Sequence, residues 1–163
     1  IVTRCTNNYG PWQHPEKFVP LLISRALQGG ELPIYGDGLH VRDWIHVEDH
    51  CAALVSILKA GIPGRIYTIA GGNTMQNVHL ASSILSLAGA RGAFLSHVED
   101  RPGHDRRYAL DDSATRAELR WEPKVPLEKG LAETVQWYRQ NRLWWERITE
   151  MNPARRHLGA RTA

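Results

Sequence analysis

The sequence predicts an α/β fold, and two observations lead to this prediction. Apolar residues recur at helical spacing in several segments, and short extended runs bounded by glycine, proline and asparagine separate these segments. The extended runs are few and short for a complete doubly wound sheet, so we interpret the 163 residues as part of a larger α/β unit. Residues Ile1 to Arg4 are typical of a buried strand, and we expect the chain to begin inside that strand.

The first half of the chain is predicted to hold a strand, two helices and a hairpin between the helices. The first helix ends at a pair of glycines, and the hairpin turns at Gly36-Asp37-Gly38. The second helix starts with two carboxylates, which favour the positive end of a helix dipole. The predicted elements are the strand 1–4, the turn-rich loop 6–11, the helix 18–27, the hairpin 32–47 and a helix with the apolar face Cys51, Leu54, Val55 and Leu58.

The second half alternates strands and helices again, with one polar interruption. Asn77 is well placed to cap a third helix with its side chain. The segment 100–107 is almost wholly polar and is not expected to form a regular element. The other predicted elements are the strands 65–69 and 94–98 and the helices 113–119 and 127–141. We divide the chain into one domain, residues 1–142, and a tail, residues 143–163, that is expected to be partly disordered.

The bulk composition argues against several classes of protein. The net charge is +3 and the isoelectric point about 9.1, but the basic residues are scattered rather than gathered in a stripe, so we expect no nucleic-acid partner. No apolar run approaches the roughly 18 residues that cross a membrane, so no membrane partner is expected. The two cysteines, Cys5 and Cys51, predict reduced, half-buried thiols in a cytoplasmic protein.

A first polar cluster, Asn7, Asn8, Glu16 and Lys17, follows the first strand. Ligand sites of α/β proteins lie at such strand ends, and two amides with a lysine offer several donors and acceptors. A turn followed by a helix cap explains the same residues. The pattern therefore leaves a ligand site and a purely structural role both open.

A second pair, Arg42-Asp43, lies inside the strand-like run after the predicted turn. A buried arginine is costly without a partner. The guanidinium either pairs with Asp43 or projects toward a phosphate, which its fork of donors suits. The sequence does not separate these two interpretations.

The densest charge cluster is the segment Asp100-Arg101-Pro102-Gly103-His104-Asp105-Arg106-Arg107. A solvated surface loop explains the charges but not their grouping around a rigid Pro-Gly turn. An anion site with arginines clamped on phosphate explains both features, so we favour it.

Catalytic and metal-binding patterns of other classes are missing from the sequence. The chain contains no Gly-x-Ser-x-Gly motif, which would mark a serine nucleophile. His46 and His50 have the spacing of a zinc helix but lack its glutamate, so no metal site is predicted.

Several motifs in a fixed order give the chain a specific family resemblance. The motifs are Thr-Asn-Asn-Tyr-Gly-Pro at 6–11, Pro-Glu-Lys at 15–17, Pro-Ile-Tyr-Gly-Asp-Gly at 33–38, Val-Arg-Asp-Trp-Ile-His-Val-Glu-Asp-His at 41–50 and Asp-Arg-Pro-Gly-His-Asp-Arg-Arg-Tyr at 100–108. Together they resemble the dTDP-glucose 4,6-dehydratases of the extended short-chain dehydrogenase/reductase superfamily, from Ile1 to about Tyr138. The Asn7-Asn8 pair and the segment 100–108 are more similar to these enzymes than to related epimerases or decarboxylases.

The resemblance implies a fold and a set of site residues. The fold is the C-terminal portion of an extended Rossmann-type, NAD(P)-binding fold with the small nucleotide-sugar-binding domain. Asn7 would hold the substrate diphosphate region, and Asn8 would contact the nicotinamide side of NAD. Arg42 would bind phosphate, and Asn77 would reach the nucleotide. The other implied substrate-binding residues are Lys17, Phe18, Pro33, Ile34, Tyr35, Asp100, Arg101, Pro102, Gly103 and His104.

The same resemblance identifies parts that this sequence lacks. Such enzymes use a Gly-x-x-Gly-x-x-Gly loop for NAD, a Tyr-x-x-x-Lys dyad and an Asp-Glu pair for water elimination. No glycine triplet and no tyrosine of this chain fits those spacings, so we assign no catalytic residue here and expect those parts before Ile1. Arg120 stands where the family has glycine, and no tyrosine follows Tyr138 to complete the pocket.

We therefore expect a chain that supplies nucleotide-sugar specificity to an NAD-dependent, homodimeric dehydratase acting on a dTDP-sugar. In that reaction C4 of the hexose is oxidised, water is lost across C5 and C6, and the hydride returns to C6. Three alternatives stay open: a stand-alone nucleotide-sugar-binding module, a fragment of a related NDP-sugar epimerase or decarboxylase, and a remnant that folds poorly.

Overall fold

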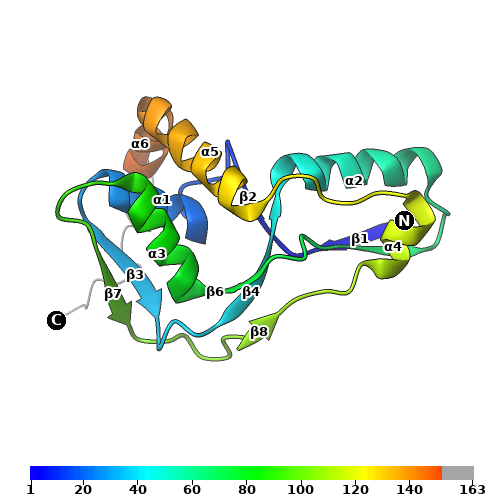
Figure 1. The fold of residues 1–163 in the computed structure, drawn as a ribbon, viewed down its shortest axis with the longest axis horizontal. Coiled ribbons are helices and arrows are strands. Elements are labelled where there is room, and N and C mark those ends of the chain that lie inside the picture. The colour runs from blue at the N-terminus through cyan, green and yellow to red at the C-terminus, as the bar shows by residue number, and fades with distance from the viewer. Residues whose placement is uncertain (152–163) are drawn as a thin grey trace.

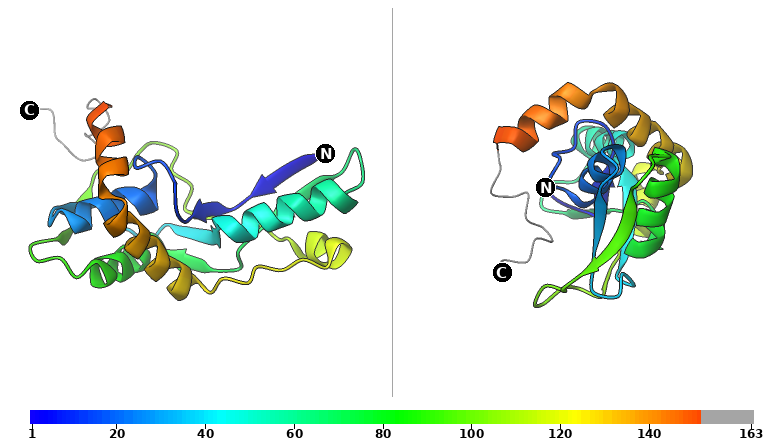
Figure 2. Two further views of the ribbon diagram at one scale, coloured as in Figure 1. Left: turned by 90° about the horizontal axis from the view of Figure 1, so that it is seen from above. Right: turned by 90° about the vertical axis from the view of Figure 1, so that its left-hand side faces the viewer.

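The computed structural model describes residues 1–151 and is elongated, with two lobes (Figures 1 and 2). Strands and helices alternate along most of it, so the α/β prediction is confirmed. The elements are β1 (Val2–Cys5), β2 (Asn7–Tyr9), α1 (Phe18–Leu27), β3 (Glu31–Tyr35), β4 (Val41–His46), α2 (Val47–Ala60), β5 (Ile66–Ile69), β6 (Thr74–Gln76), α3 (Asn77–Ala88), β7 (Phe94–Val98), β8 (Arg107–Tyr108), α4 (Ser113–Leu119), α5 (Leu127–Gln140) and α6 (Arg142–Met151).

The strands form three small groups, mostly with parallel pairing. β1 pairs with β5, and β3 pairs with β7, both in parallel. β4 is the hub of the third group, because it pairs in parallel with β2 and β8 and antiparallel with β6. β4 runs between the two lobes, so residues on it face both of them (Figure 1).

Each lobe has its own apolar core. In the helical lobe, side chains of α1, α3, α5 and α6 close over β3, and Leu22, Leu80 and Trp145 are fully buried. In the other lobe, α2 packs on β4 and β5 through Ala53 and Ile57. Burying one such aliphatic side chain contributes about 1.5–3 kcal/mol. β4 contributes to both cores, through Trp44 to the first and through Ile45 to the second.

The predicted hairpin over residues 32–47 is wrong. β3 and β4 are both strands, but they belong to different sheets, because β3 pairs with β7 in register Pro33 to Ser96. Gly38 adopts a φ of +74°, and an added Cβ would lie 2.9 Å from the Val78 Cβ. The glycine turn therefore lets α3 pack against the link between the strands instead of pairing them.

The predicted apolar face of the second helix is only partly correct. Leu54 packs against the core, but Cys51 is exposed, Val55 is 48% exposed and Leu58 83% exposed. The helix buries a stripe displaced from the predicted one, through Ala53 and Ile57. The first strand is likewise exposed rather than buried, because β5 is its only strand partner among residues 1–151.

The start of α3, the polar segment 100–107 and the C-terminal tail differ from the sequence-based expectations. Asn77 does not cap α3: it is the first helical residue, the N-cap is Gln76, and no side chain caps this end. A two-residue strand, β8, ends the polar segment 100–107. The expected tail contains α6, which packs Trp145 into the core; its remainder, residues 152–163, lies outside the described residues. No helix within residues 1–151 combines the length and apolarity that a membrane span requires.

Candidate functional site

The candidate site is centred on Arg42 in β4. Arg42 is 8% exposed, and its guanidinium Nη1 donates to the carbonyl oxygen of the adjacent Val41 at 2.8 Å. Burial lowers the pKa of Arg42, although a guanidinium remains charged in proteins. No carboxylate within residues 1–151 forms an ion pair with it at the distances of a salt bridge. Asp105 is the carboxylate that favours the charged guanidinium, from beyond the distance of a salt bridge, while Arg101 opposes it. The buried guanidinium is therefore only partly compensated and suits a further anion.

The proposed pairing of Arg42 with Asp43 does not occur. Asp43 is 1% exposed, and its two carboxylate oxygens accept the backbone N–H of Gly71 at 3.0 Å and of Asn73 at 2.6 Å. Asp43 therefore organises the turn between β5 and β6. Of the two interpretations of Arg42, the one with an external anion remains.

Asn77 lies beside Arg42 across the β4–β6 ladder. The register places Val41 opposite Gln76, and the backbone N–H of Asn77 donates to the carbonyl of His40 at 2.9 Å. Asn77 is 8% exposed, and its Oδ1 is buried without a hydrogen-bond partner. A buried carbonyl oxygen of this kind is normally bonded, so it is available to a donor of a ligand.

The polar segment 100–107 is tied to the same part of β4. The backbone N–H of Val41 donates to the Arg106 carbonyl at 2.9 Å, and β8 continues the pairing. Arg106 Nη1 lies 2.7 Å from Asp37 Oδ1, and this contact holds the pKa of Asp37 at about 2. Arg101, Pro102 and Gly103 precede these anchors in the chain and are exposed. The segment is therefore fixed beside β4 at its C-terminal end.

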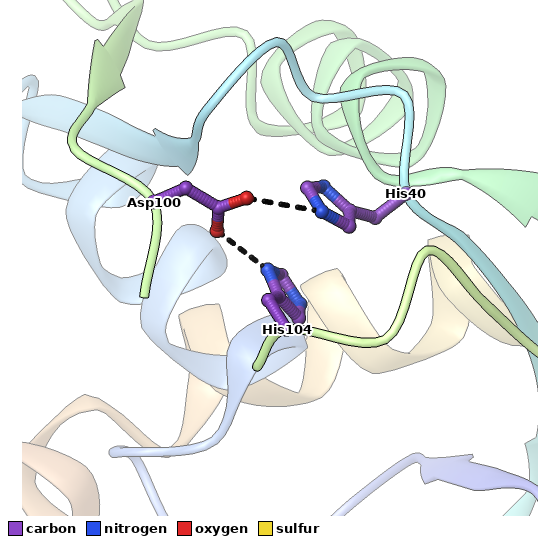
Figure 3. Close-up of side chains that lie close together, drawn as sticks. All are labelled: His40, Asp100 and His104. Carbon is purple, nitrogen blue, oxygen red and sulfur yellow. Dashed lines mark hydrogen bonds and ion pairs between the residues drawn. The ribbon is translucent and has the colours of Figure 1, made fainter. Parts of the chain in front are cut away.

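A cluster of His40, Asp100 and His104 joins the link before β4 to the segment 100–107 (Figure 3), and of these residues sequence analysis missed His40. Asp100 Oδ2 lies 3.1 Å from His40 Nε2, and Asp100 Oδ1 lies 2.7 Å from His104 Nδ1. The two imidazole rings stack with centroids 3.9 Å apart, and Tyr35 meets His104 edge to face at 5.9 Å. His40 and Asp100 are far apart in the sequence and have no motif spacing, so no sequence signal linked them.

These three side chains are also a candidate cation site by composition. Their geometry argues against one shared ion. A ring nitrogen coordinates a metal in the plane of its ring, and the two rings are nearly parallel, at 16°, with centroids 3.9 Å apart. A single ion cannot lie in both planes. The two oxygens of one carboxylate, in contrast, can each meet one ring.

Asn7 and Asn8 are brought to the other half of β4, opposite Trp44 and Ile45. Successive strand residues point to opposite faces, so the two amides cannot share one face. Asn8 is already bonded: its Oδ1 meets His50 Nδ1 at 2.8 Å, and its Nδ2 donates to the Thr6 carbonyl at 3.2 Å. Burial lowers the pKa of His50, which favours the neutral ring.

The remaining predicted residues are spread around this frame. Phe18 stacks on Trp44 with centroids 6.1 Å apart, which links the start of α1 to β4. The Lys17 side chain is 60% exposed, with Nζ 3.5 Å from Glu16 Oε1. Pro33 and Ile34 are buried, and Ile34 belongs to the core with no exposed surface. Tyr35 is therefore the residue of this strand whose ring reaches the cluster of His40, Asp100 and His104.

A separate concave region lies between α2 and α4, lined among others by Asp49, Arg116 and Trp121. None of the predicted site residues lines it. Asp49 is occupied there, because its carboxylate accepts the backbone N–H groups of Lys124 and Val125 at 3.0 and 2.9 Å. The chemistry of the site therefore gathers at β4 and not in this hollow.

The chain is similar to known sugar-nucleotide enzymes over most of its length. A family model described as GDP-mannose 4,6 dehydratase matches residues 1–134. The dTDP-glucose 4,6-dehydratase of Streptomyces niveus is 48% identical over 154 residues, which cover 94% of this chain and 46% of that protein. The chain thus spans less than half the length of the curated relatives that it matches first.

Solved structures agree with the sequence comparison. The dTDP-glucose 4,6-dehydratase DesIV from Streptomyces venezuelae, solved with NAD and TYD bound, gives a TM-score of 0.86 at 49% identity, covering 90% of this chain and 45% of that one. A UDP-glucose 4-epimerase from Thermotoga maritima, solved with UDP-glucose, gives a TM-score of 0.80 at 32% identity, covering 85% of this chain and 45% of that one.

Proposed function

Because the chain belongs to the family described as GDP-mannose 4,6 dehydratase, we propose that it forms the nucleotide-sugar-binding part of a dTDP-glucose 4,6-dehydratase. The whole protein converts dTDP-glucose to dTDP-4-keto-6-deoxyglucose and water, with NAD as cofactor. The observation that carries this proposal is the buried Arg42 guanidinium, which has no ion-pair partner within residues 1–151. A diphosphate matches the charge and the donor geometry of that group.

The substrate contacts follow from where the polar groups lie. Arg42 and Arg101 neutralise the diphosphate, and Asn77 Oδ1 accepts a hydrogen bond from the nucleotide. The segment 100–104 covers the ribose and diphosphate, with Tyr35 on its inner side. The proposed substrate-binding residues are Asn7, Lys17, Phe18, Pro33, Ile34, Tyr35, Arg42, Asn77, Asp100, Arg101, Pro102, Gly103 and His104. The buried Ile34 contributes through its backbone, since its side chain is in the core.

NAD supplies the oxidising chemistry when it is bound in the whole enzyme. In this chain the proposed contact is Asn8, whose side-chain amide is already held by His50, Thr6 and Cys5. That amide therefore has little hydrogen-bonding capacity left for a ligand. It suits van der Waals contact with the nicotinamide better than hydrogen bonding to a phosphate. The Gly-rich loop and the acid–base residues belong, in this proposal, to the rest of the protein, which acts as a homodimer.

Calorimetry tests the nucleotide specificity directly. The chain is titrated with dTDP, UDP and GDP under one set of conditions. We expect dTDP to bind more tightly than the other two, and we expect binding to weaken as salt is raised, because the contact is between charges. Equal affinity for all three, or none for any, contradicts a site built for dTDP.

Activity measurements test the division of roles. Mixed with NAD and the N-terminal half of the Streptomyces niveus enzyme, the chain is expected to restore conversion of dTDP-glucose to a 4-keto product that absorbs in alkali. Alone with NAD it is expected to be inactive, because general acid–base catalysis contributes about 10²–10⁴-fold and no such pair is assigned here. Turnover by the chain alone contradicts this division.

A second candidate is an epimerase fragment, favoured by the fold shared with the UDP-glucose 4-epimerase. The two functions differ in base and in product. Preference for UDP in the titration, together with an epimeric product in the mixing experiment, supports the epimerase.

A further inference from the structure

We propose that His40 is a positioning residue of the nucleotide-sugar site: by sharing the Asp100 carboxylate with His104, it holds the His104 ring with Nδ1 protonated and Nε2 free to accept a hydrogen bond from a ligand hydroxyl. The ligand in this inference rests on the proposed function. The arrangement of the three side chains does not.

The hydrogen bonds fix which nitrogens carry protons. An ionised carboxylate only accepts hydrogen bonds, so each ring nitrogen that faces Asp100 carries its hydrogen. The nitrogen facing Oδ2 is Nε2 of His40, and the nitrogen facing Oδ1 is Nδ1 of His104 (Figure 3). In their neutral forms the two rings therefore adopt opposite tautomers. The hydrogen bond from His104 lowers the pKa of Asp100 and so favours its ionised carboxylate.

His40 is held neutral by its surroundings. Its side chain is 4% exposed, and its Nδ1 is buried without a hydrogen-bond partner. Protonation would add an N–H there with no acceptor, which leaves a buried donor unsatisfied. Burial lowers the pKa of His40, and His104, Arg106 and Arg42 lower it further, while Asp100 opposes them. The neutral His40 ring thus donates one hydrogen bond to one oxygen of the Asp100 carboxylate.

The stack of the two rings then sets the direction of His104. The His104 side chain is 5% exposed, its ring lies on His40, and Tyr35 closes its edge. Among residues 1–151, no hydrogen-bond partner meets its Nε2. With hydrogen on Nδ1, Nε2 of the neutral ring is an acceptor. It therefore suits a hydroxyl donor and not a phosphate oxygen, which is itself an acceptor.

The hydroxyl can come from the pentose or from the hexose of a nucleotide sugar. Three probes separate these sources: dTDP, 3′-deoxythymidine diphosphate and dTDP-glucose. A pentose contact predicts that dTDP binds about three- to tenfold more tightly than the 3′-deoxy compound, the scale of one neutral hydrogen bond. A hexose contact predicts equal binding of those two and tighter binding of dTDP-glucose. In either case the gain is expected to vanish in His104→Phe.

Long-range ¹H–¹⁵N correlation spectra of the imidazoles test the arrangement without ligand. We expect the Nε2–H tautomer for His40 and the Nδ1–H tautomer for His104. In His40→Leu, which removes the donor, His104 is expected to lose its fixed tautomer, and dTDP affinity is expected to fall about threefold. His40→Gln keeps an N–H donor and is expected to restore both. His79→Leu, an exposed change on α3, is the matched control and should alter neither.

The outcomes separate this inference from the proposed function. An Nε2–H tautomer of His104 in the unaltered chain overturns the inference, even if dTDP binds. An unchanged His104 tautomer and affinity in His40→Leu overturn it as well. Absence of dTDP binding together with the stated tautomers contradicts the proposed function but supports the arrangement of the rings. If His40→Leu does not fold, the spectra of the unaltered chain and of His40→Gln still decide.

Discussion

Arg42 and Asp43 are neighbours on β4 but do not pair, because Asp43 gives both carboxylate oxygens to the backbone N–H groups of Gly71 and Asn73. Adjacent strand residues point to opposite faces, so the two charges serve different sides of the sheet. Asp43 supports the turn after β5, and Arg42 remains available to an anion.

The first prediction concerns this separation of roles. Arg42→Ala is expected to weaken dTDP binding about ten- to a hundredfold, because a hydrogen bond to a charged group contributes about 1.5–3 kcal/mol. Arg101→Ala should cost less, since Arg101 is exposed and its charge is screened by solvent. His104→Ala should cost less than Arg42→Ala. Calorimetry of the three variants measures the order, and a larger loss from His104→Ala contradicts the assignment of Arg42 to the diphosphate.

Asp43→Asn is the matched variant on the other side of β4. We expect it to lower the free energy of unfolding by about 1.5–3 kcal/mol, because the two backbone donors lose a charged acceptor. Folded protein should still bind dTDP with near-normal affinity. A large loss of affinity with unchanged stability would mean that Asp43 contacts the ligand.

The second prediction concerns Gly71, the backbone of which packs directly against the backbone of β4. A Cβ at this position would lie 1.9 Å from the Trp44 carbonyl oxygen and 3.0 Å from the Ile45 Cα. Backbone atoms cannot move aside as a flexible side chain can, so Gly71→Ala is expected to destabilise by more than the about 1–3 kcal/mol of ordinary overpacking.

Gly30→Ala provides the control for this change. Its added Cβ would meet the Arg25 carbonyl at 3.5 Å, an ordinary contact, and its φ is not left-handed. Urea unfolding of both variants measures the difference. Similar stabilities would show that the contact between Gly71 and Trp44 relaxes freely.

The third prediction concerns the pH dependence of stability. Burial lowers the pKa values of His40 and His50 below the ordinary value of 6.5, so the unfolded chain binds more protons than the folded chain in the window just below that value. Stability therefore falls as the pH drops below 6.5 toward the folded-state pKa values. Asp37, with a pKa of about 2, titrates far below this window.

Urea unfolding at about pH 7.5 and about pH 5.5 measures this effect on either side of the ordinary histidine pKa. In the double variant His40→Gln/His50→Gln, most of the difference between the two pH values is expected to disappear. An undiminished difference in that variant would assign the pH dependence to other groups.

Helical spacing predicted α1 and α5 closely, because each of these two helices buries a stripe of mostly apolar side chains. The bounds of α4 were also predicted, although Thr115 is its only buried residue. The same spacing misjudged α2, where Val55 and Leu58 fit the periodicity but Ala53 and Ile57 make the contacts. Which stripe is buried depends on the neighbouring strands, and the sequence does not show their positions. The hairpin prediction was wrong for a related reason: a glycine turn specifies a reversal but not the partner of each strand.

The candidate site was predictable only where its residues lie in short motifs. Arg42 and the segment 100–107 were proposed as site residues from local charge, and excluding Asp43 as the partner of Arg42 needed the contacts of Asp43. His40 lay outside every motif considered, because its partner Asp100 lies in a distant part of the sequence, in the connection between β7 and β8. Contacts between distant segments follow from topology, which local patterns do not encode.

The last prediction concerns α6, which the sequence assigned to a loose tail. Trp145 has no exposed surface, and its Nε1 donates to the Tyr138 carbonyl at 2.8 Å. Tyr138 in turn donates its hydroxyl to the Gln13 carbonyl, and Gln13 Nε2 donates to the Asn8 carbonyl at 2.9 Å. The helix therefore supports the loop that leads from β2 into α1.

Trp145→Ala is expected to lower the free energy of unfolding by about 3–5 kcal/mol, the cost of removing a buried tryptophan side chain. Leu143→Ala changes a side chain of the same helix that is 74% exposed, and it should stay within about 0.5 kcal/mol of the unaltered chain. Urea unfolding followed by circular dichroism compares the two. Equal stabilities would mean that α6 does not contribute to the core and that the domain ends at α5, as a division at residue 142 requires.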